Sequence, residues 1–282
     1  MVFRSGVTSG RYRPNVHGTA RDGINDPRQQ WTTSMHLFEF NDHPSVPVAV
    51  RKTLLEQLES CNTIFRPYYR QVSEAVLSHA SESDAKMIVE LGAGTAPLSK
   101  LMAEDAGSEG IRLVACDLFP DKAAYRELET RYPDKVTGME DPVDFGQPRR
   151  WPPSTVLVLC AAMHHVPSQL RPAVIEALSA SADQVMVFEP VRKTALSMFF
   201  VLFGVFPPLL LPLCYLHKPG RLRRLLWCWL LPVVPVMTLW DALVGCLRQW
   251  NDHDWQEAFA ESSSGQRKPV VNSAVHSQVV TW

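Results

Sequence analysis

Short apolar runs alternate with longer amphipathic stretches through the middle of the chain. The runs are rich in Val, Leu and Ile, lack regular polar alternation, and cover residues 87–91, 111–116, 136–139, 156–160 and 185–188. Strands that are buried on both faces of a parallel sheet have this pattern. Because segments of helix length separate the runs, the pattern predicts βαβ units and a doubly wound α/β domain over residues 86–190.

The chain before this domain divides into two parts. Residues 1–30 are polar and rich in turn-forming residues, which predicts disorder. Residues 31–85 carry apolar positions at helical spacing, such as Leu54, Leu55 and Leu58, and a second helical pattern follows Pro67. We therefore expect a helical N-terminal lid over residues 31–85.

The chain after this domain also divides into two parts. Residues 191–250 form a long apolar insertion, which predicts further helices. Residues 251–282 are polar and predict the closing strands of the sheet, with residues 277–282 as an edge strand. Residues 262–276 have weak strand character, so the pattern leaves open whether the sheet is complete at that edge.

Composition and charge narrow the class of protein. The chain has 282 residues, 46% apolar and 20% charged, which are ordinary globular values. A formal net charge of −1 gives no field that attracts nucleic acid, so no nucleic-acid partner is expected. The six cysteines lack C-x-x-C and zinc-finger spacing, which is typical of reduced cytoplasmic thiols. Neither an apolar leader nor a carboxylate cluster is evident, so we expect a cytoplasmic protein without a metal.

One segment departs from this average. Residues 194–247 contain only five ionic side chains, Lys218, Arg221, Arg223, Arg224 and Asp241. The uncharged stretch 194–216 is long enough to span a bilayer. Prolines interrupt it, however, and the basic loop 217–224 would have to be translocated, against the positive-inside rule. Two interpretations stay open: a lid that touches at most the membrane surface, or insertion into the membrane.

The first predicted strand runs into a glycine turn and then a helix. Gly92 and Gly94 remove the side chains that would keep a ligand from the backbone N–H groups of this turn. Glu90 stands two residues earlier, where it would repel a pyrophosphate but not a cationic ligand. Pro97 occupies the position where a dinucleotide-binding motif needs a third small residue. A nicotinamide-dependent oxidoreductase is therefore disfavoured.

Acidic residues follow the next two predicted strands. Asp117 can accept both hydroxyls of a ribose, or it can cap the following helix. Asp144 can accept from an adenine amino group, or it can be an ordinary loop acid. Because ligands of such sheets bind at the carboxyl ends of the strands, the ordered series of Glu90, Asp117 and Asp144 favours a nucleoside site.

These segments together resemble the class I S-adenosylmethionine (SAM)-dependent methyltransferases. The resemblance covers about residues 86–190 and rests on VELGAGTAPL (89–98), VACDLF (114–119), EDPVDF (140–145), VLVLCAAMHHVP (156–167) and VMVFEP (185–190). It implies a mostly parallel seven-stranded sheet with a reversed final hairpin, and SAM across the strand ends. More narrowly, the chain is similar to a poorly characterised group of microbial small-molecule methyltransferases with a long apolar C-terminal segment. The shared features are HLFEF (36–40), a His-His pair and Trp240-Asp241.

The resemblance also implies which residues hold SAM. Glu90, Gly92 and Gly94 would surround its methionine half, and Asp117 would bind the ribose. Leu118 would pack on the adenine, whose edge Asp144 and Phe145 would hold. The implied cofactor set is completed by Thr95 and Cys160.

A pair of histidines follows the fourth strand. His164 and His165 lie on the loop that should face the methyl group, and a histidine can remove a proton from an O–H or N–H acceptor near neutral pH. One of them is expected to act as base or to position the acceptor, and the alternative is a structural role. The fourth strand lacks the Asn/Asp-Pro-Pro-Tyr pattern of enzymes that methylate DNA bases or protein glutamine.

Four further residues are candidates for contact with the acceptor: Trp31, His36, Phe40 and Asp241. The first three precede the core domain, where their alternative is ordinary helix packing. Asp241 is an isolated acid in an apolar stretch and needs a partner. It either faces water or substrate, or pairs with an arginine such as Arg248.

We thus expect an enzyme that transfers a methyl group from SAM to O or N, less readily C, of a small, fairly apolar molecule in secondary metabolism. The alternative is a degenerate methyltransferase fold that acts as a membrane-associated binding or partner protein. Nothing in the sequence determines the oligomeric state.

Overall fold

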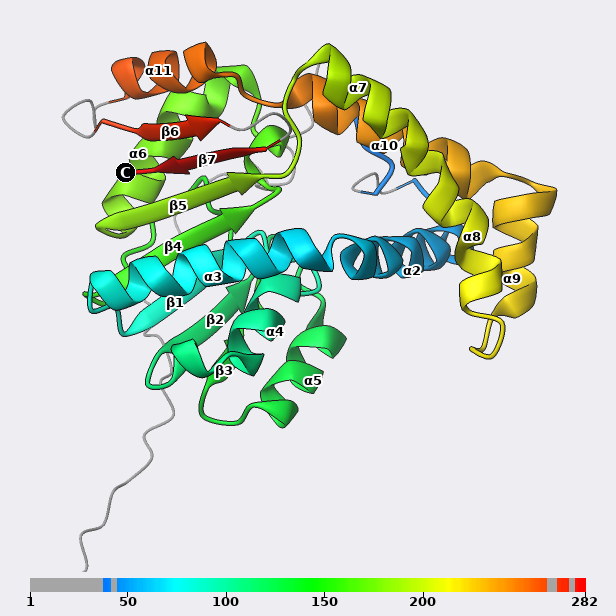
Figure 1. The fold of residues 1–282 in the computed structure, drawn as a ribbon, viewed down its shortest axis with the longest axis horizontal. Helices are drawn as coiled ribbons and strands as arrows, with labels where there is room; N and C mark the ends of the chain where they lie inside the picture. Colours follow the sequence, from blue (N-terminus) through cyan, green and yellow to red (C-terminus); the bar gives the residue numbers. More distant parts are fainter. Residues whose placement is uncertain (1–37, 42–44, 263–267, 274–276) are drawn as a thin grey trace, which may run out of the picture.

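A computed structural model describes residues 38–41, 45–262, 268–273 and 277–282 (Figure 1). The predictions for residues 1–30, Trp31 and His36 lie outside these residues. Seven strands form one sheet in the order β3-β2-β1-β4-β5-β7-β6. Their bounds are β1 Met87–Leu91, β2 Arg112–Cys116, β3 Val136–Gly138, β4 Thr155–Cys160, β5 Gln184–Glu189, β6 Val270–Ser273 and β7 Gln278–Thr281.

The sheet has the predicted fold class. Strands β1 to β5 are parallel, and β7 runs antiparallel to both β5 and β6. The prediction of an edge strand at 277–282 was wrong, because β7 lies between β5 and β6, and β6 forms the edge. Burial explains the order: Gln278 and Val280 of β7 are buried, whereas β6 is largely exposed. The sheet is thus complete.

Helices cover both faces of the sheet. On one face α3 (Arg66–Glu82), α4 (Pro97–Glu104) and α5 (Lys122–Arg131) pack on strand residues such as Ile88 and Leu113. On the other face α6 (Arg171–Ser181) and α11 (Asp252–Glu261) pack on residues such as Val89 and Leu157. Strands β1, β4 and β5 and most of β2 are therefore buried on both faces, which explains their continuous apolar sequence.

The segment predicted as one N-terminal lid is divided between two parts of the molecule. Helix α3 belongs to the sheet domain, where Val72, Val76 and Leu77 enter its core. Helix α2 (Val48–Ile64) extends away from the sheet and packs against the apolar insertion (Figure 1). Since one helical pattern follows the other without a gap, the sequence could not separate them.

The apolar insertion forms a helical arm, defined here as residues 195–248. Helix α7 (Ala195–Val201), η4 (Leu202–Val205) and α8 (Phe206–Cys214) form one 20-residue helix that leads away from the sheet. By length and composition this helix could cross a membrane. The chain returns through α9 (Arg221–Leu225) and η5 (Leu226–Leu230), bends by 68°, and continues as α10 (Val233–Arg248) back to the sheet domain (Figure 1).

Candidate functional site

The glycine turn after β1 has the backbone geometry that the sequence predicts. Gly92, Gly94 and Ala96 have φ angles of +67°, +54° and +57°. A Cβ atom at Gly92 would lie 3.0 Å from the Cβ of Ala162, so a side chain there would press on the loop after β4. A Cβ atom at Gly94 would meet nothing within 4 Å. The turn is therefore tightly packed at Gly92, and its backbone is open to a ligand at Gly94.

Glu90 lies beneath this turn rather than on its surface. Its carboxylate is buried and accepts hydrogen bonds from the backbone N–H and the hydroxyl of Ser99, in the first turn of α4. It thus caps the helix that follows the glycine turn. Burial raises the pKa of Glu90 to about 7, despite the bonds from Ser99. This carboxyl group therefore titrates near neutral pH.

Asp117 connects the glycine turn to the end of β2. Its carboxylate accepts from the backbone N–H of Gly94 at 2.8 Å and of Phe119 at 2.7 Å. The alternative that Asp117 caps the next helix is wrong, because Asp121 caps α5 through the N–H groups of Ala123 and Ala124. Each carboxylate oxygen has a second lone pair, so Asp117 can still accept hydroxyl groups of a ligand.

The loop after β3 joins this arrangement. The N–H of Val143 donates to the carbonyl of Asp117 at 2.8 Å, which places Asp144 and Phe145 beside the end of β2. The ring of Phe145 lies near Gly92, where a Cβ atom would be 3.9 Å from its Cε1. The carboxylate of Asp144 accepts from the N–H of Gly146. Leu118, Asp144 and Phe145 are all partly exposed at this edge of the sheet.

Two further residues of the implied cofactor set have contacts from the N-terminal helices. The amide of Asn62 in α2 donates to the hydroxyl of Thr95 at 3.2 Å. Cys160, at the end of β4, packs with Tyr68 of α3. The hydroxyl of Tyr68 is buried and has no hydrogen-bond partner among the described residues. Burial, together with the neighbouring Cys160 and Glu189, raises the pKa of Tyr68, so its hydroxyl keeps its proton and can donate to a ligand.

His164 is held by a buried carboxylate at the end of the next strand. Its Nδ1 lies 3.0 Å from Oε2 of Glu189, whose other oxygen accepts from the N–H of Met163 at 2.8 Å. Gln249 of α10 also donates to Glu189. Burial opposes ionisation of Glu189, but His164 and these hydrogen bonds outweigh it and lower the pKa of Glu189. An ionised Glu189 fixes Nδ1 of His164 as the protonated nitrogen and leaves Nε2 as the acceptor.

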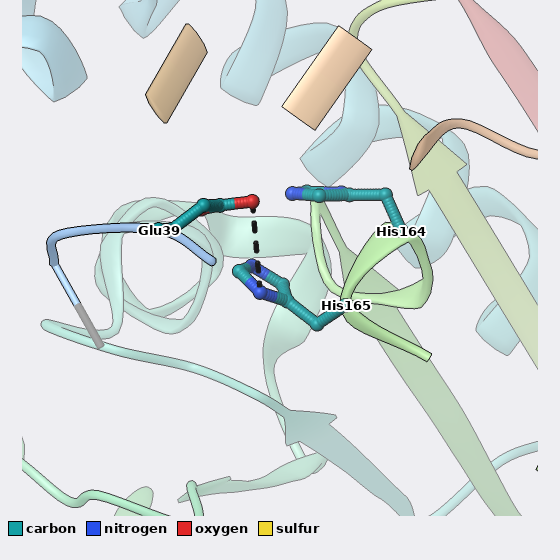
Figure 2. Close-up of side chains that lie close together, drawn as sticks. All are labelled: Glu39, His164 and His165. Atoms are coloured by element: carbon teal, nitrogen blue, oxygen red, sulfur yellow. Dashed lines mark ion pairs between the residues drawn. The ribbon is translucent and has the colours of Figure 1, made fainter. Parts of the chain in front are cut away.

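The ring of His165 lies beside that of His164, tilted by 35°, and faces Glu39 (Figure 2). The ring centroids are 4.3 Å apart, and Nδ1 of His165 lies 4.0 Å from Oε1 of Glu39. Glu39 is buried, and Arg248 donates to that same oxygen at 2.8 Å. Ligand atoms of Glu39, His164 and His165 lie within 4.8 Å of one another, so the three could hold a metal ion. An ion bound there would have to compete with the Arg248 guanidinium for Glu39.

The first described residues are attached to α10 rather than to the sheet. Asp241 accepts from the N–H groups of Phe40 at 2.7 Å and Asn41 at 3.0 Å. Trp240 donates from its indole to the carbonyl of Phe38. Arg248 pairs with Glu39, whereas the sequence suggested it as a partner of Asp241. Asp241 therefore fixes the segment that carries Glu39 beside the histidines, and contact of Phe40 or Asp241 with an acceptor stays a prediction.

Comparisons with solved structures bear on the fold. A plantazolicin methyltransferase in complex with SAH is 7% identical, with a TM-score of 0.51, and the match covers 90% of this chain and 92% of the other. A proposed O-methyltransferase from Nostoc punctiforme is 9% identical, with a TM-score of 0.50, and the match covers 90% and 65%. The magnesium protoporphyrin IX methyltransferase from Synechocystis, with bound SAH, is 14% identical, with a TM-score of 0.44, and the match covers 85% and 88%. No protein-family model and no curated protein sequence matches the chain.

The first two matches each cover 90% of this chain, with TM-scores of 0.50 and 0.51. The chain has the class I methyltransferase fold. In this methyltransferase fold the glycine turn, Asp117, Asp144 and Phe145 all lie at the carboxyl ends of the parallel strands, where such sheets bind ligands.

Sequence reasoning assigned no role to two polar residues near this site. Glu189 holds His164, and the buried hydroxyl of Tyr68 has no hydrogen-bond partner among the described residues. Glu39 belongs to the HLFEF segment and Arg248 was expected to pair with Asp241, but the sequence placed neither beside His165. A signal existed for Glu189, because it is an acid at the end of an otherwise apolar run, as Glu90 is. No local signal marks Tyr68, which comes from a helix distant in sequence.

Proposed function

We propose that the protein is a SAM-dependent methyltransferase that acts on O or N, less readily C, of a small, fairly apolar molecule. One observation carries the proposal. The glycine turn, Asp117 and the Asp144-Phe145 loop are bonded or packed together, and the His164–Glu189 pair begins at the loop that contacts Gly92. A nucleoside site and a candidate proton acceptor are thus adjacent.

The residues present suit SAM. Asp117 and Asp144 offer acceptors for the ribose and the adenine amino group, and Phe145 offers a flat apolar surface. The open backbone at Gly94 admits a ligand, and the ionised form of Glu90 favours a cation over an anion. When bound, the cofactor would supply an electrophilic methyl group.

The contribution of the protein's own residues is to orient the acceptor and to receive its proton. An acceptor O–H or N–H must lose that proton as its lone pair forms the new bond to carbon. Nε2 of His164 receives it, while Glu189 stabilises the resulting imidazolium through Nδ1–H. Gly245 of α10 keeps side chains away from this nitrogen, since even a Cβ atom there would lie 3.7 Å from Nε2.

The class of acceptor follows from charge and from the arm. The net charge of −1 provides no attraction for nucleic acid, and the apolar arm leads directly to the site through α10. We therefore propose a small apolar acceptor of the kind methylated in secondary metabolism, by a cytoplasmic enzyme that associates with a membrane through residues 194–247.

The alternative is a membrane-associated binding protein with a degenerate methyltransferase fold. An incomplete sheet would favour it, but β6 and β7 are paired along their length. The arm is compatible with both proposals. The two differ in whether methyl transfer occurs at all.

Two measurements test the proposed function. Isothermal titration of the full chain with S-adenosylhomocysteine (SAH) should show binding, and incubation with labelled SAM and fractionated metabolite extracts should yield a labelled apolar product. Absence of SAH binding at high protein concentration would rule out the proposal. Binding without any labelled product across lipid and polar extracts would favour the degenerate binding protein.

Glu90→Gln should change the preference between SAM and SAH. The sulfonium of SAM carries a positive charge that the thioether of SAH lacks, so ionised Glu90 should favour SAM. Because the pKa of Glu90 is about 7, the ratio of SAM to SAH affinity should rise with pH through that value, and Glu90→Gln should reduce the ratio by up to about tenfold at pH 8. Parallel titrations at pH 6 and pH 8 measure it.

The matched control is Glu104→Gln, at the exposed end of α4, the helix that Glu90 caps. The control should keep the pH-dependent ratio of the unmodified protein. An equal ratio in the unmodified protein and in Glu90→Gln would show that Glu90 acts only as the helix cap.

A further inference from the structure

The outer face of the arm presents an uninterrupted apolar stripe. Spacings of three and four residues place six side chains on one side of the helix from Ala195 to Cys214. Each is about half exposed: Leu196, Phe199, Phe203, Phe206, Leu210 and Leu213. The rings of Phe199, Phe203 and Phe206 contact one another in succession, 5.5 Å and 6.0 Å apart. Only 22% of the most apolar window of this helix is buried.

The returning half of the arm also exposes large apolar side chains. Leu222, Leu230 and Val236 are 82%, 75% and 62% exposed, and Trp229 and Leu231 are about half exposed. Monomeric proteins rarely expose contiguous apolar surface of this extent unless a partner covers it. The exposed side chains are bulky and belong to Phe, Leu and Trp, which favour the interfacial region of a bilayer.

Another side of the arm is covered by α2, which carries charged side chains. Leu211 and Val234 of the arm pack against Val50 and Leu54 of α2. Glu56 of α2 forms ion pairs with Arg223 and Arg224 near the tip of the arm. Helix α2 also exposes charged side chains, Lys52 and Glu59. An arm that crossed a bilayer would carry these charges into the hydrocarbon or lose α2, and both are costly.

The exposed charge on the arm has one sign. Of the ionic side chains in residues 194–247, all of which the structure describes, only Lys218 and Arg221 are exposed. Asp241 is buried, Arg224 is buried in the turn, and Arg223 is partly buried beside Glu56. A basic tip beside an apolar face matches a membrane surface with anionic lipids.

We propose that the arm docks on one leaflet of an anionic phospholipid membrane. The stripe from Leu196 to Leu213 enters the interface, Lys218 and Arg221 contact lipid headgroups, and α2 stays on the aqueous side. The arm binds as a monotopic element and does not span the membrane. This docking requires neither SAM nor an acceptor, so it stands or falls independently of methyl transfer.

Vesicle flotation of the full chain tests the docking. The protein should float with vesicles of phosphatidylcholine containing 30% phosphatidylglycerol, and about tenfold more weakly with phosphatidylcholine alone. Phe203→Gln with Leu210→Gln should weaken flotation at least tenfold, and Lys218→Gln with Arg221→Gln should remove the preference for anionic vesicles. The control is Phe65→Gln with Val270→Gln, which removes comparable exposed side chains outside the arm and should float normally.

Circular dichroism and SAH titration of each variant verify folding without using lipid. Three results would overturn the docking. The first is that the unmodified protein does not float. The second is that the protein stays in the vesicles after a carbonate wash and a protease inside the vesicles cleaves the tip of the arm, and the third is that the arm substitutions abolish self-association but not flotation. The second would indicate a spanning arm, and the third a second copy of the chain on the apolar stripe.

Discussion

His164→Ala should lower kcat by about 10²- to 10⁴-fold, the usual contribution of a positioned general base. The reason is the geometry of the His164–Glu189 pair, in which Nδ1 lies 3.0 Å from a buried carboxylate and Nε2 is left as the acceptor. SAH affinity should change little, because His164 is not in the implied cofactor set. Single-turnover methylation of the acceptor found in the labelled-SAM screen measures the effect.

Glu189→Gln provides the readout that separates orientation of the base from general damage. Without the carboxylate, Nδ1 of His164 loses its charged hydrogen-bond partner, so the ring is no longer held in one tautomer and orientation. The rate should fall by about 10- to 100-fold, while SAH affinity should change little.

His165→Ala is the matched control within the pair. His165 packs beside His164 but faces Glu39 at 4.0 Å, so its removal should cost less than removal of His164. A loss as large as that of His164→Ala, together with an unchanged rate in Glu189→Gln, would assign the base to His165. Unchanged rates in both histidine variants would mean that neither histidine acts as a base. Catalysis would then come only from the alignment of the methyl donor with the acceptor.

Asp117→Ala should weaken SAH and SAM binding by about 100-fold. The substitution removes the proposed ribose acceptor and also releases the N–H groups of Gly94 and Phe119, so the glycine turn loses its link to β2. Hydrogen bonds to a charged group contribute about 1.5–3 kcal/mol each, and the loss of one or two accounts for this factor. Isothermal titration with SAH measures it.

Asp121→Ala is a demanding control, because Asp121 lies four residues away and also holds two backbone N–H groups. Loss of this helix cap should cost about 1 kcal/mol of unfolding free energy and leave SAH affinity unchanged. Thermal melts and titrations of both variants distinguish the roles. Equal affinity losses in both would mean that Asp117 acts only through stability of the fold.

The core of the fold was predictable because each buried strand leaves a local mark. The runs at β1, β2, β4 and β5 are apolar without alternation, which only a sheet covered on both faces requires. The order of the strands in the sheet, however, depends on contacts between segments that are distant in sequence. Residues 278–281 read as a strand, but their place between β5 and β6 depends on a pairing that the apolar pattern does not contain.

The candidate site was predictable to the same extent. Asp117 stands directly after β2 and Asp144 lies on the loop after β3, so position alone suggested them. Glu189 holds His164 only because β4 and β5 are neighbours in the sheet. Glu56 meets Arg223 across 167 residues, and no periodicity links them. Contacts between distant segments require the three-dimensional fold.

Helix α2 has two attachments that give it a role beyond packing. Glu56 is bonded to the tip of the arm, and Asn62, less than two helical turns later, is bonded to Thr95 in the glycine turn. Helix α2 thus links the arm directly to the loop proposed to hold the cofactor. Thermodynamic reciprocity then sets a condition: if membrane docking tightens cofactor binding by some factor, the cofactor must tighten membrane docking by the same factor. A cell could in this way recruit the loaded protein to its lipid surface and release the empty one.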